Sequence, residues 1–316
     1  MVAGAFVVAI ALSQAYPNLP DISDLVDYQP KLPLRVYSSE GVLIGEFGEE
    51  RRTLTPIREI PKVMVDAVLA IEDTRFFEHN GVDYKGILRA ALANLGKVKS
   101  QGASTITMQV ARNVYLSSEK TYTRKIYEVL LTFKLEHLLT KEKILEVYMN
   151  QIFLGHRAYG FAAASEVYFG KPLKNITIAE AAMLAGLPKA PSAYNPISNL
   201  KRARVRQLHI IDRLEENGFI TAEQAEEARN EPLRLRRDRP RENAAHADYV
   251  AEMARQLIFD QYGEAAYTKG LNVYTTLKLD EQNVAYKALR EAAWPTERPR
   301  GFGGRGRFVP SQRVAG

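Results

Sequence analysis

The feature that most constrains the fold is a long series of helical patterns between residues 60 and 230, punctuated by helix start and stop signals. Apolar residues recur at helical spacing in successive segments, and Pro61 stands at the start of the first one. Two later segments open with the Thr-x-x-Glu/Gln capping pattern, at Thr177 and Thr221, and Gly218 ends the helix between them. This stretch predicts one mainly α-helical domain. Within it we expect helices at residues 86–95, 105–116, 123–139, 141–150 and 159–169.

The segments on either side have a different character. Residues 34–55 carry β-branched and aromatic residues around a Ser-Glu-Gly turn, which predicts a β-hairpin. Residues 271–280 alternate as in a strand and indicate the start of a second module. The basic segment 232–241 predicts a linker or an edge strand, and the Gly- and Arg-rich residues after Trp294 predict no fixed structure.

The first residues are apolar and uncharged from Val2 to Leu12, and Tyr16 and Pro17 follow. This run is shorter than the roughly 20 residues that cross a bilayer, and it lacks the positive flank of a signal peptide. We interpret it as the outer end of a membrane anchor, with an apolar helix packed on the domain as the alternative. We thus expect a partial anchor at 1–16, a linker and hairpin at 17–59, the helical domain at 60–231, and a linker with the incomplete second module at 232–316.

Composition excludes some classes of protein. An apolar fraction of 46% argues against disorder, and the lack of cysteine excludes disulfides and thiolate metal sites. The net charge of +6 is compatible with phosphates or membrane surfaces and does not choose between them.

The first candidate site is EDTRFFEHNGVD, from Glu72 to Asp83. Two carboxylates end an apolar helical pattern there, and Phe76 and Phe77 follow. Desolvation beside aromatic rings would raise the pKa of a carboxyl group toward values that suit proton transfer. The alternative is a simple helix end, with both rings in a core.

The second candidate site is QGASTITMQVARN, from residue 101 to 113. Gly102 precedes Ser104, which could cap the next helix and leave N–H groups for a phosphate. Thr105, Gln109 and Arg112 then fall on one helical face. The alternative is that this polar stripe faces solvent.

The third candidate site is KTYTRKIYE, where Arg124, Lys125 and Glu128 project from one helical face. Lys120 and Arg112 are two further cations in this short span of sequence. Because arginine side chains bind phosphate oxygens bidentately, the cluster suits a diphosphate. The alternative is an intrahelical salt bridge worth about 0.2–0.5 kcal/mol.

Taken in order, EDTRFFEHNG, GASTITMQ, RKIYE, KILEVYMN and HRAYGFAAASEVYFG resemble the five successive motifs of the peptidoglycan glycosyltransferases, glycosyltransferase family 51. This family occurs in class A penicillin-binding proteins, and the chain resembles one that stops before the transpeptidase domain, so no transpeptidase activity is expected. Two positions depart from the family pattern: Met108 replaces a glutamine, and Tyr127 replaces a lysine.

The resemblance implies a lysozyme-like helical fold and a reaction that polymerises lipid II into β-1,4-linked glycan, with inversion and release of undecaprenyl diphosphate. It implies Glu72 as the general base and Glu128 as a second carboxylate, the latter a possible contact to Mg²⁺ or Mn²⁺ through the diphosphate. We assign substrate contacts to Asp73, Phe76, His79, Ser104, Thr105, Gln109, Arg112, Lys120, Arg124, Lys125, Asn150 and Arg157.

The expected partners are lipid II, the nascent glycan strand, the membrane lipid surface and other cell-wall synthesis proteins. The expected location is the bacterial inner membrane, with a single span and the catalytic domain facing the periplasm. We expect no nucleic acid partner, because the basic segments 201–206 and 234–241 lack interleaved aromatics and suit a solvated helix face or membrane-proximal charge. Two alternatives stay open: a lysozyme-like lytic glycosidase and an inactive membrane-anchored scaffold of the cell wall.

Overall fold

The computed structural model describes residues 30–88, 104–116, 122–236 and 246–293, together with Leu19, Ile22 and Leu25. The predicted anchor at 1–16 and the tail after Trp294 lie outside the described residues, as does most of the helix predicted at 86–95. Among the helices that are described, none is long and apolar enough to span a bilayer.

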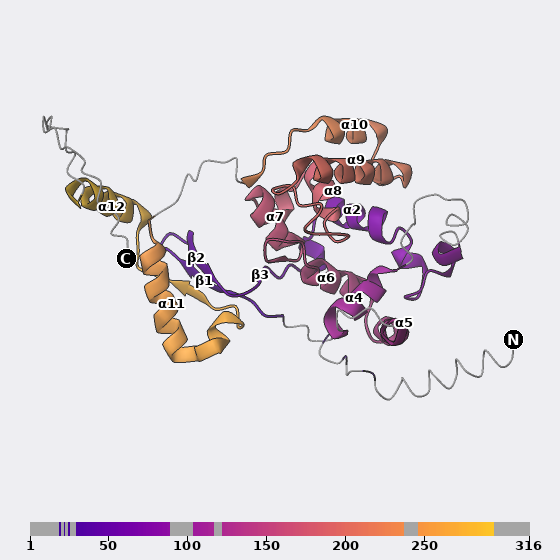
Figure 1. Cartoon of the computed structure of the whole chain (residues 1–316), viewed down its shortest axis with the longest axis horizontal. Coiled ribbons are helices and arrows are strands. Elements are labelled where there is room, and N and C mark those ends of the chain that lie inside the picture. The colour runs from indigo at the N-terminus through magenta and orange to yellow at the C-terminus, as the bar shows by residue number, and fades with distance from the viewer. Residues whose placement is uncertain are drawn as a thin grey trace, which may run out of the picture.

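The larger part of the molecule is a bundle of α-helices, as predicted (Figure 1). Its helices are α2 (Lys62–Glu72), α4 (Ile106–Tyr115), α5 (Tyr122–Leu138), α6 (Lys141–Gln151), α7 (Phe161–Phe169), α8 (Ile178–Ala185), α9 (Leu200–Glu216) and α10 (Ala222–Asn230). Short 3-10 turns at Ile57–Glu59, Phe76–Glu78 and Leu173–Asn175 connect them.

Capping fixes where several of these helices begin. Thr177 and Thr221 each accept a hydrogen bond from the backbone N–H three residues later, and the side chains of Glu180 and Gln224 return the bond, so both predicted capping boxes are present. Gly218 adopts a left-handed φ of 71° just after α9. These signals depend on local chemistry alone, which is why the sequence was sufficient to place them.

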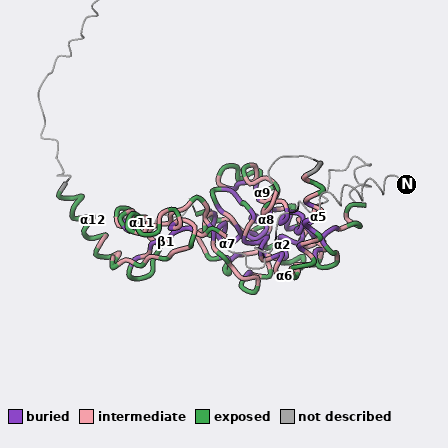
Figure 2. The backbone as a smooth tube through the Cα atoms, turned by 90° about the horizontal axis from the view of Figure 1, so that it is seen from below, coloured by how far each residue is buried: buried purple, intermediate pink, exposed green. Residues whose placement is uncertain are grey.

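The core of the bundle is formed by α2, α6, α7 and α8. Met64, Val68 and Ile144 are fully buried, and the small residues of α8 are buried on every side. Figure 2 shows the buried residues concentrated around α2, α6 and α8. Small side chains let α8 approach both α2 and α9 closely, and this packing fixes the end of α2 where Glu72 lies.

The smaller part is a three-stranded sheet with strand order β2–β1–β5 (Figure 1). The predicted hairpin is present as β1 (Leu34–Tyr37) and β2 (Leu43–Phe47), and β1 also pairs in parallel with β5 (Asn272–Tyr274). Helix α11 (Asp248–Tyr262) packs on this sheet through Ala251 and Ala254, and a 3-10 turn at Gly263–Tyr267 follows it. No sequence pattern indicated that the hairpin and the segment after residue 246 share one sheet.

Two predicted elements were wrong in their extent. The strand predicted at 271–280 ends at Tyr274, and α12 (Leu279–Ala293) begins within that range, because Asp280 and Glu281 are favourable in the first turn of a helix. Helix α7 begins at Phe161, two residues later than predicted, since Ala158–Tyr159 form strand β4, which pairs with β3 (Arg51–Arg52).

Candidate active site

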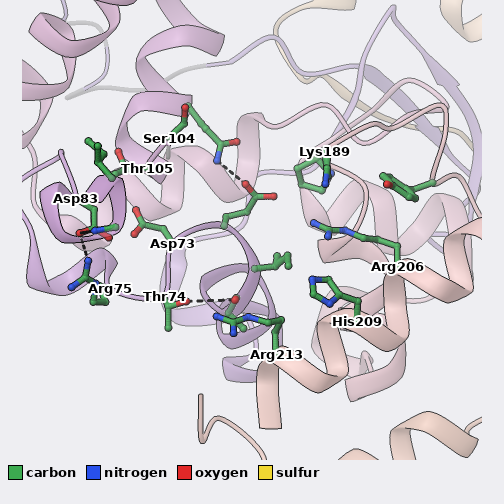
Figure 3. A pocket seen from close by; sticks show the side chains of 18 of the residues that line it. Asp73, Thr74, Arg75, Asp83, Ser104, Thr105, Lys189, Arg206, His209 and Arg213 are labelled. Carbon is green, nitrogen blue, oxygen red and sulfur yellow. Dashed lines mark hydrogen bonds and ion pairs between the residues drawn. The ribbon is translucent and has the colours of Figure 1, made fainter. Parts of the chain in front are cut away.

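The end of α2 opens into a cleft with a volume of about 920 Å³. Glu72 is the last residue of α2, and its side chain lines the cleft between α4 on one side and α9 on the other. Figure 3 shows the labelled residues Asp73, Ser104 and Thr105 on one side of this pocket, with Lys189 and Arg206 on the opposite side. The residues that carry polar side chains into the cleft are Glu72, Asp73, Thr74, Arg75, Asp83, Ser104, Thr105, Gln109, Arg112, Lys189, Tyr194, Arg202, Arg206, His209 and Arg213.

Burial raises the pKa of Glu72 above its ordinary value. Four groups oppose this shift without cancelling it. The side-chain amide of Gln109 donates a hydrogen bond of 2.8 Å to Oε2 of Glu72. The charges of Arg206, Arg112 and Lys189 also favour the ionised form. The result is a carboxyl group of raised pKa that faces a cleft, which is the arrangement expected of a group that exchanges protons with a ligand.

Asp73 lies beside Glu72 but has a different environment. It is buried, and its two oxygens lie 3.0 and 3.1 Å from Nε2 of His79. Its Oδ2 also accepts a 3.0 Å hydrogen bond from the backbone N–H of Ile106, the first residue of α4. Asp73 and His79 therefore join the end of α2 to the start of α4, which suits a supporting role.

The two phenylalanines of the first motif differ in exposure. Phe76 is completely buried in the hydrophobic core, and Nζ of Lys141 lies 4.4 Å from the centre of its ring. The assignment of Phe76 as a substrate contact was therefore wrong, because no part of the ring is accessible. Phe77, by contrast, is 55% exposed.

The polar stripe of α4 faces inward. Thr105 and Gln109 are buried, and with Arg112 they line the cleft, so the solvent-facing alternative does not hold. The cap of this helix is Thr105 and not Ser104 as predicted: Oγ1 of Thr105 accepts a 3.2 Å bond from the N–H of Met108 and donates a 2.5 Å bond to the carbonyl of Gly81. Ser104 lines the cleft one residue earlier.

Glu128 lies on α5, on a different helix from Glu72, as predicted. Its side chain is 1% exposed, does not line the cleft, and forms a 2.5 Å ion pair with Nζ of Lys125. The same Nζ lies 3.5 Å from Oγ of Ser104. Glu128 is thus connected to the cleft through Lys125. Arg124 lies one residue before Lys125 on α5, and Lys120 lies outside the described residues.

Asn150 and Arg157 do not lie at the cleft. Asn150 is buried, and its side chain bridges the backbone of Thr55 and the carbonyl of Glu146. The guanidinium of Arg157 donates hydrogen bonds to the backbone carbonyls of Gly48 and Glu49. Both residues attach the segment after the hairpin to the bundle and do not line the cleft, so their assignment as substrate contacts stays a prediction.

The wall of the cleft that α9 provides was not predicted from the sequence. We interpreted residues 201–206 as a solvated or membrane-proximal face, whereas Arg202 and Arg206 line the cleft. Arg202, Arg206, His209 and Arg213 lie at positions i, i+4, i+7 and i+11, which is one helical face. That spacing was visible in the sequence. The inward direction of the face was not.

Among the described residues, no group of three or more His, Cys, Asp or Glu side chains is placed to hold a metal ion. Glu128 is almost inaccessible and already paired with Lys125. The described side chains therefore do not fit a metal that protein ligands hold by themselves.

Comparison with known proteins identifies the protein family to which the chain belongs. Residues 40–215 match the family described as transglycosylase, and the chain belongs to this family. The matched range includes the whole wall of the cleft that α2, α4 and α9 provide.

Individual relatives agree with this assignment. The chain is 52% identical to penicillin-binding protein 1A of Neisseria meningitidis serogroup A and 45% identical to that of Escherichia coli, over 97% and 91% of its length. It spans 38% and 34% of those two relatives. A crystal structure of penicillin-binding protein 1A from Haemophilus influenzae aligns with 90% of the chain and 33% of that protein, with 30% identity and a TM-score of 0.47.

Proposed function

We propose that this chain is a peptidoglycan glycosyltransferase that polymerises lipid II, a disaccharide-pentapeptide on undecaprenyl diphosphate. The observation that carries the proposal is the place of Glu72 at the wall of a cleft in a transglycosylase-family domain, where burial raises its pKa and where Arg112, Lys189 and Arg206 also line the cleft. A base and a set of cations are the two components that the reaction requires.

In the proposed reaction Glu72 accepts the proton of the 4-hydroxyl of the acceptor sugar. The hydroxyl oxygen forms a bond to the anomeric carbon of the growing strand, and the bond from that carbon to the diphosphate breaks. Attack on the face opposite to the leaving group converts an α-linked diphosphate into a β-1,4 linkage. The proton remains on Glu72 until solvent removes it, and undecaprenyl diphosphate leaves with the electron pair.

The leaving diphosphate is proposed to lie beside α4. Arg112 and Ser104 line the cleft there, and Lys125 lies next to Ser104. Fixed cations at this position would stabilise the charge that develops on the leaving oxygen. In this arrangement Glu128 acts as a positioning residue, since its ion pair holds Lys125 at the edge of the cleft.

Mg²⁺ or Mn²⁺ is a proposal that depends on the substrate. Mg²⁺ commonly keeps several water ligands and binds through substrate phosphates with few protein carboxylates. An ion that enters with the diphosphate is thus compatible with the described side chains, and it would supply further positive charge at the leaving group.

A lytic glycosidase is the nearest enzymatic alternative, because a carboxyl group of raised pKa can also act as an acid. Such an enzyme has a neutral leaving group and no need for a cationic cleft. Arg112, Lys189 and Arg206 therefore favour the polymerase. We further propose, from the similarity to penicillin-binding proteins 1A, that the chain works at the bacterial inner membrane with the domain facing the periplasm, alongside other cell-wall synthesis proteins.

The test is incubation with lipid II in detergent, followed by separation of the glycan products. We expect polymer from the parent chain and an about 1,000-fold lower rate from Glu72→Gln, because a positioned general base typically contributes a factor of this order. Glu78→Gln is the matched control, because Glu78 is an exposed carboxylate six residues away that does not line the cleft.

Two results would contradict the proposal. Polymer formation by Glu72→Gln at the parental rate would remove Glu72 as the base. Release of short sugars from preformed glycan, without polymer from lipid II, would identify the chain as a glycosidase.

A further inference from the structure

A short segment joins the sheet to the helical bundle. It comprises residues 48–57, which follow β2, include β3 and precede α2, and we call it the strap (Figure 1). We call the three-stranded sheet together with α11 the sheet module. Beside the strap lies a cavity of about 650 Å³, which is lined by Phe47 and Tyr267 of the sheet module and by Arg157 of the bundle. The two parts are therefore not packed against each other at this point.

Arg157 holds the first residues of the strap from the side of the bundle. Its guanidinium donates hydrogen bonds to two successive carbonyl groups, that of Gly48 and, at 2.8 Å, that of Glu49. The carbonyl of Arg157 accepts a 2.8 Å bond from the N–H of Arg51. Two carbonyls can be bound in this way because the guanidinium presents several N–H groups in a fixed fork, whereas lysine has no such fork.

The backbone of Arg157 adopts an uncommon conformation. Its φ is 62° and that of His156 is 47°, and these two are the non-glycine residues of positive φ in the part of the chain that the structure describes. A left-handed conformation at a long side chain costs free energy and persists only where the surrounding contacts impose it. The bonds between Arg157 and the strap are such contacts. Without them the loop would relax to an ordinary φ, so the loop has two states.

The strap also connects the sheet to α6. In β1, Nη2 of Arg35 donates a 2.9 Å bond to the carbonyl of Arg52. The guanidinium of Arg52 in turn donates a 3.0 Å bond to the carbonyl of Asn150, near the end of α6. On the same helix, Oε2 of Glu146 accepts a 2.9 Å bond from the N–H of Ile57. Because α6 packs against α4, a displacement of the strap acts on the α4 side of the cleft.

We propose that Arg157 is a latch that couples the orientation of the sheet module to the activity of the cleft. With the latch closed, the strap is fixed, and α6 and α4 keep the arrangement described above. With the latch open, Arg157 takes an ordinary φ, the sheet module turns about the strap, and glycosyl transfer is slower. This inference rests on the proposed function. Arg157 is a positioning residue in it, because it contacts the strap and does not line the cleft.

The latch gives the sheet module a regulatory role. A ligand or partner that binds the module more tightly in one of its two orientations would shift the population of that orientation and thereby change the rate at the cleft.

Two variants open the latch from opposite sides. Arg157→Lys keeps the charge and removes the fork. Gly48→Ala acts from the strap, because residue 48 has a φ of 147° and a Cβ atom there would lie 3.2 Å from Pro33. The matched controls are Arg290→Lys, at an exposed position of α12, and Gly41→Ala, where φ is 77° and an added Cβ would meet no described atom within 4 Å outside its own chain neighbours.

Orientation and turnover are measured separately. The chain contains no cysteine, so spin labels at Gln261→Cys in α11 and Glu227→Cys in α10 report the distance between the sheet module and the bundle by double electron–electron resonance. Polymerisation of lipid II gives kcat and KM. We expect both latch variants to broaden the distance distribution and to lower kcat about tenfold with KM unchanged, a factor of the order common for coupling between two sites. Both controls should keep the parental distribution and the parental kcat.

Each contrary result has its own meaning. A parental distance distribution in both latch variants, with melting temperatures that confirm folding, would overturn the proposal. A broadened distribution with parental kcat would overturn the coupling to the cleft. A raised KM in Arg157→Lys that Gly48→Ala does not share would identify Arg157 as a substrate contact instead. If the parent chain forms no polymer, the proposed function is rejected, and the distance measurement still decides whether the latch exists.

Discussion

Two glutamates of this domain lie in contrasting surroundings. Glu72 ends α2 at the wall of the cleft, where its nearest partner is the neutral amide of Gln109. Glu128 lies in the middle of α5, away from the cleft, where Lys125 neutralises it at 2.5 Å. The pKa of Glu72 is raised, because burial outweighs the hydrogen bond and the more distant cations.

The difference teaches that burial of a carboxyl group does not by itself make a base. A buried carboxylate with a close cation depends on that cation, and the pair contributes to structure. A buried carboxyl group with a neutral partner and access to a ligand can exchange a proton. The two glutamates thus differ both in their partner and in their access to the cleft, since Glu72 is intermediate in exposure and Glu128 is buried.

The largest expected effect concerns the pair at Glu128. Lys125→Met leaves a nearly inaccessible carboxylate without its cation, so we expect unfolding to become easier by about 2–3 kcal/mol, less than for a fully buried pair because Lys125 is half-exposed. Urea denaturation measures this change. Lys143→Met is the control: Lys143 and Glu146 form a pair of the same i, i+3 spacing that is more exposed, and the loss should be about 0.5 kcal/mol. Equal losses of unfolding free energy in the two variants would show that Glu128 does not depend on Lys125.

The second prediction concerns the neutral partner of Glu72. Gln109→Leu removes a hydrogen bond to the ionised carboxylate, so the pKa of Glu72 should rise further. The acid limb of the pH profile of kcat/KM should then move to higher pH, with a rate about tenfold lower on that limb. Asn113→Leu, at an exposed position of the same helix, is the control. A uniform loss of rate with an unmoved limb would indicate a packing effect alone.

The smallest expected effect is a gain in folding stability, whereas the first prediction is a loss. Because the folded-state pKa of Glu72 is raised, its contribution to stability is complete below its unfolded pKa and is lost as the pH rises through the folded pKa. Glu72→Gln has no carboxyl group to ionise, so the variant does not lose this stability as the pH rises. At pH 7 its melting temperature should therefore be higher than that of the parent chain by roughly 2–4 °C. The difference should vanish near pH 4. A lower melting temperature at pH 7 would mean that the ionised Glu72 stabilises the fold.

Local signals in the sequence were sufficient to predict the helical domain. The capping threonines, the glycine after α9 and the spacing of apolar residues predicted the bundle, since each depends on neighbours within four residues. The same applies to Glu72, whose place at the end of an apolar helix was visible.

What the sequence could not provide is the direction in which polar faces point. The face of α9 that bears Arg206 was indistinguishable from a solvated one until α9 was packed against α2 and α8. The contacts of Asn150, Arg157 and Phe76 were not visible for the same reason, because their partners lie in distant segments of the chain or in the core.

The sheet at the far end of the molecule has a consequence for how the chain acquires its structure. Strand β1 precedes the helical domain and β5 follows it, so residues 238 positions apart, such as Tyr37 and Thr275, are hydrogen-bonded. Bringing such distant residues together costs loop-closure entropy unless the intervening chain has already become compact. The helical domain, which contains the cleft, should therefore fold first and bring the two strands into register, with the sheet forming last.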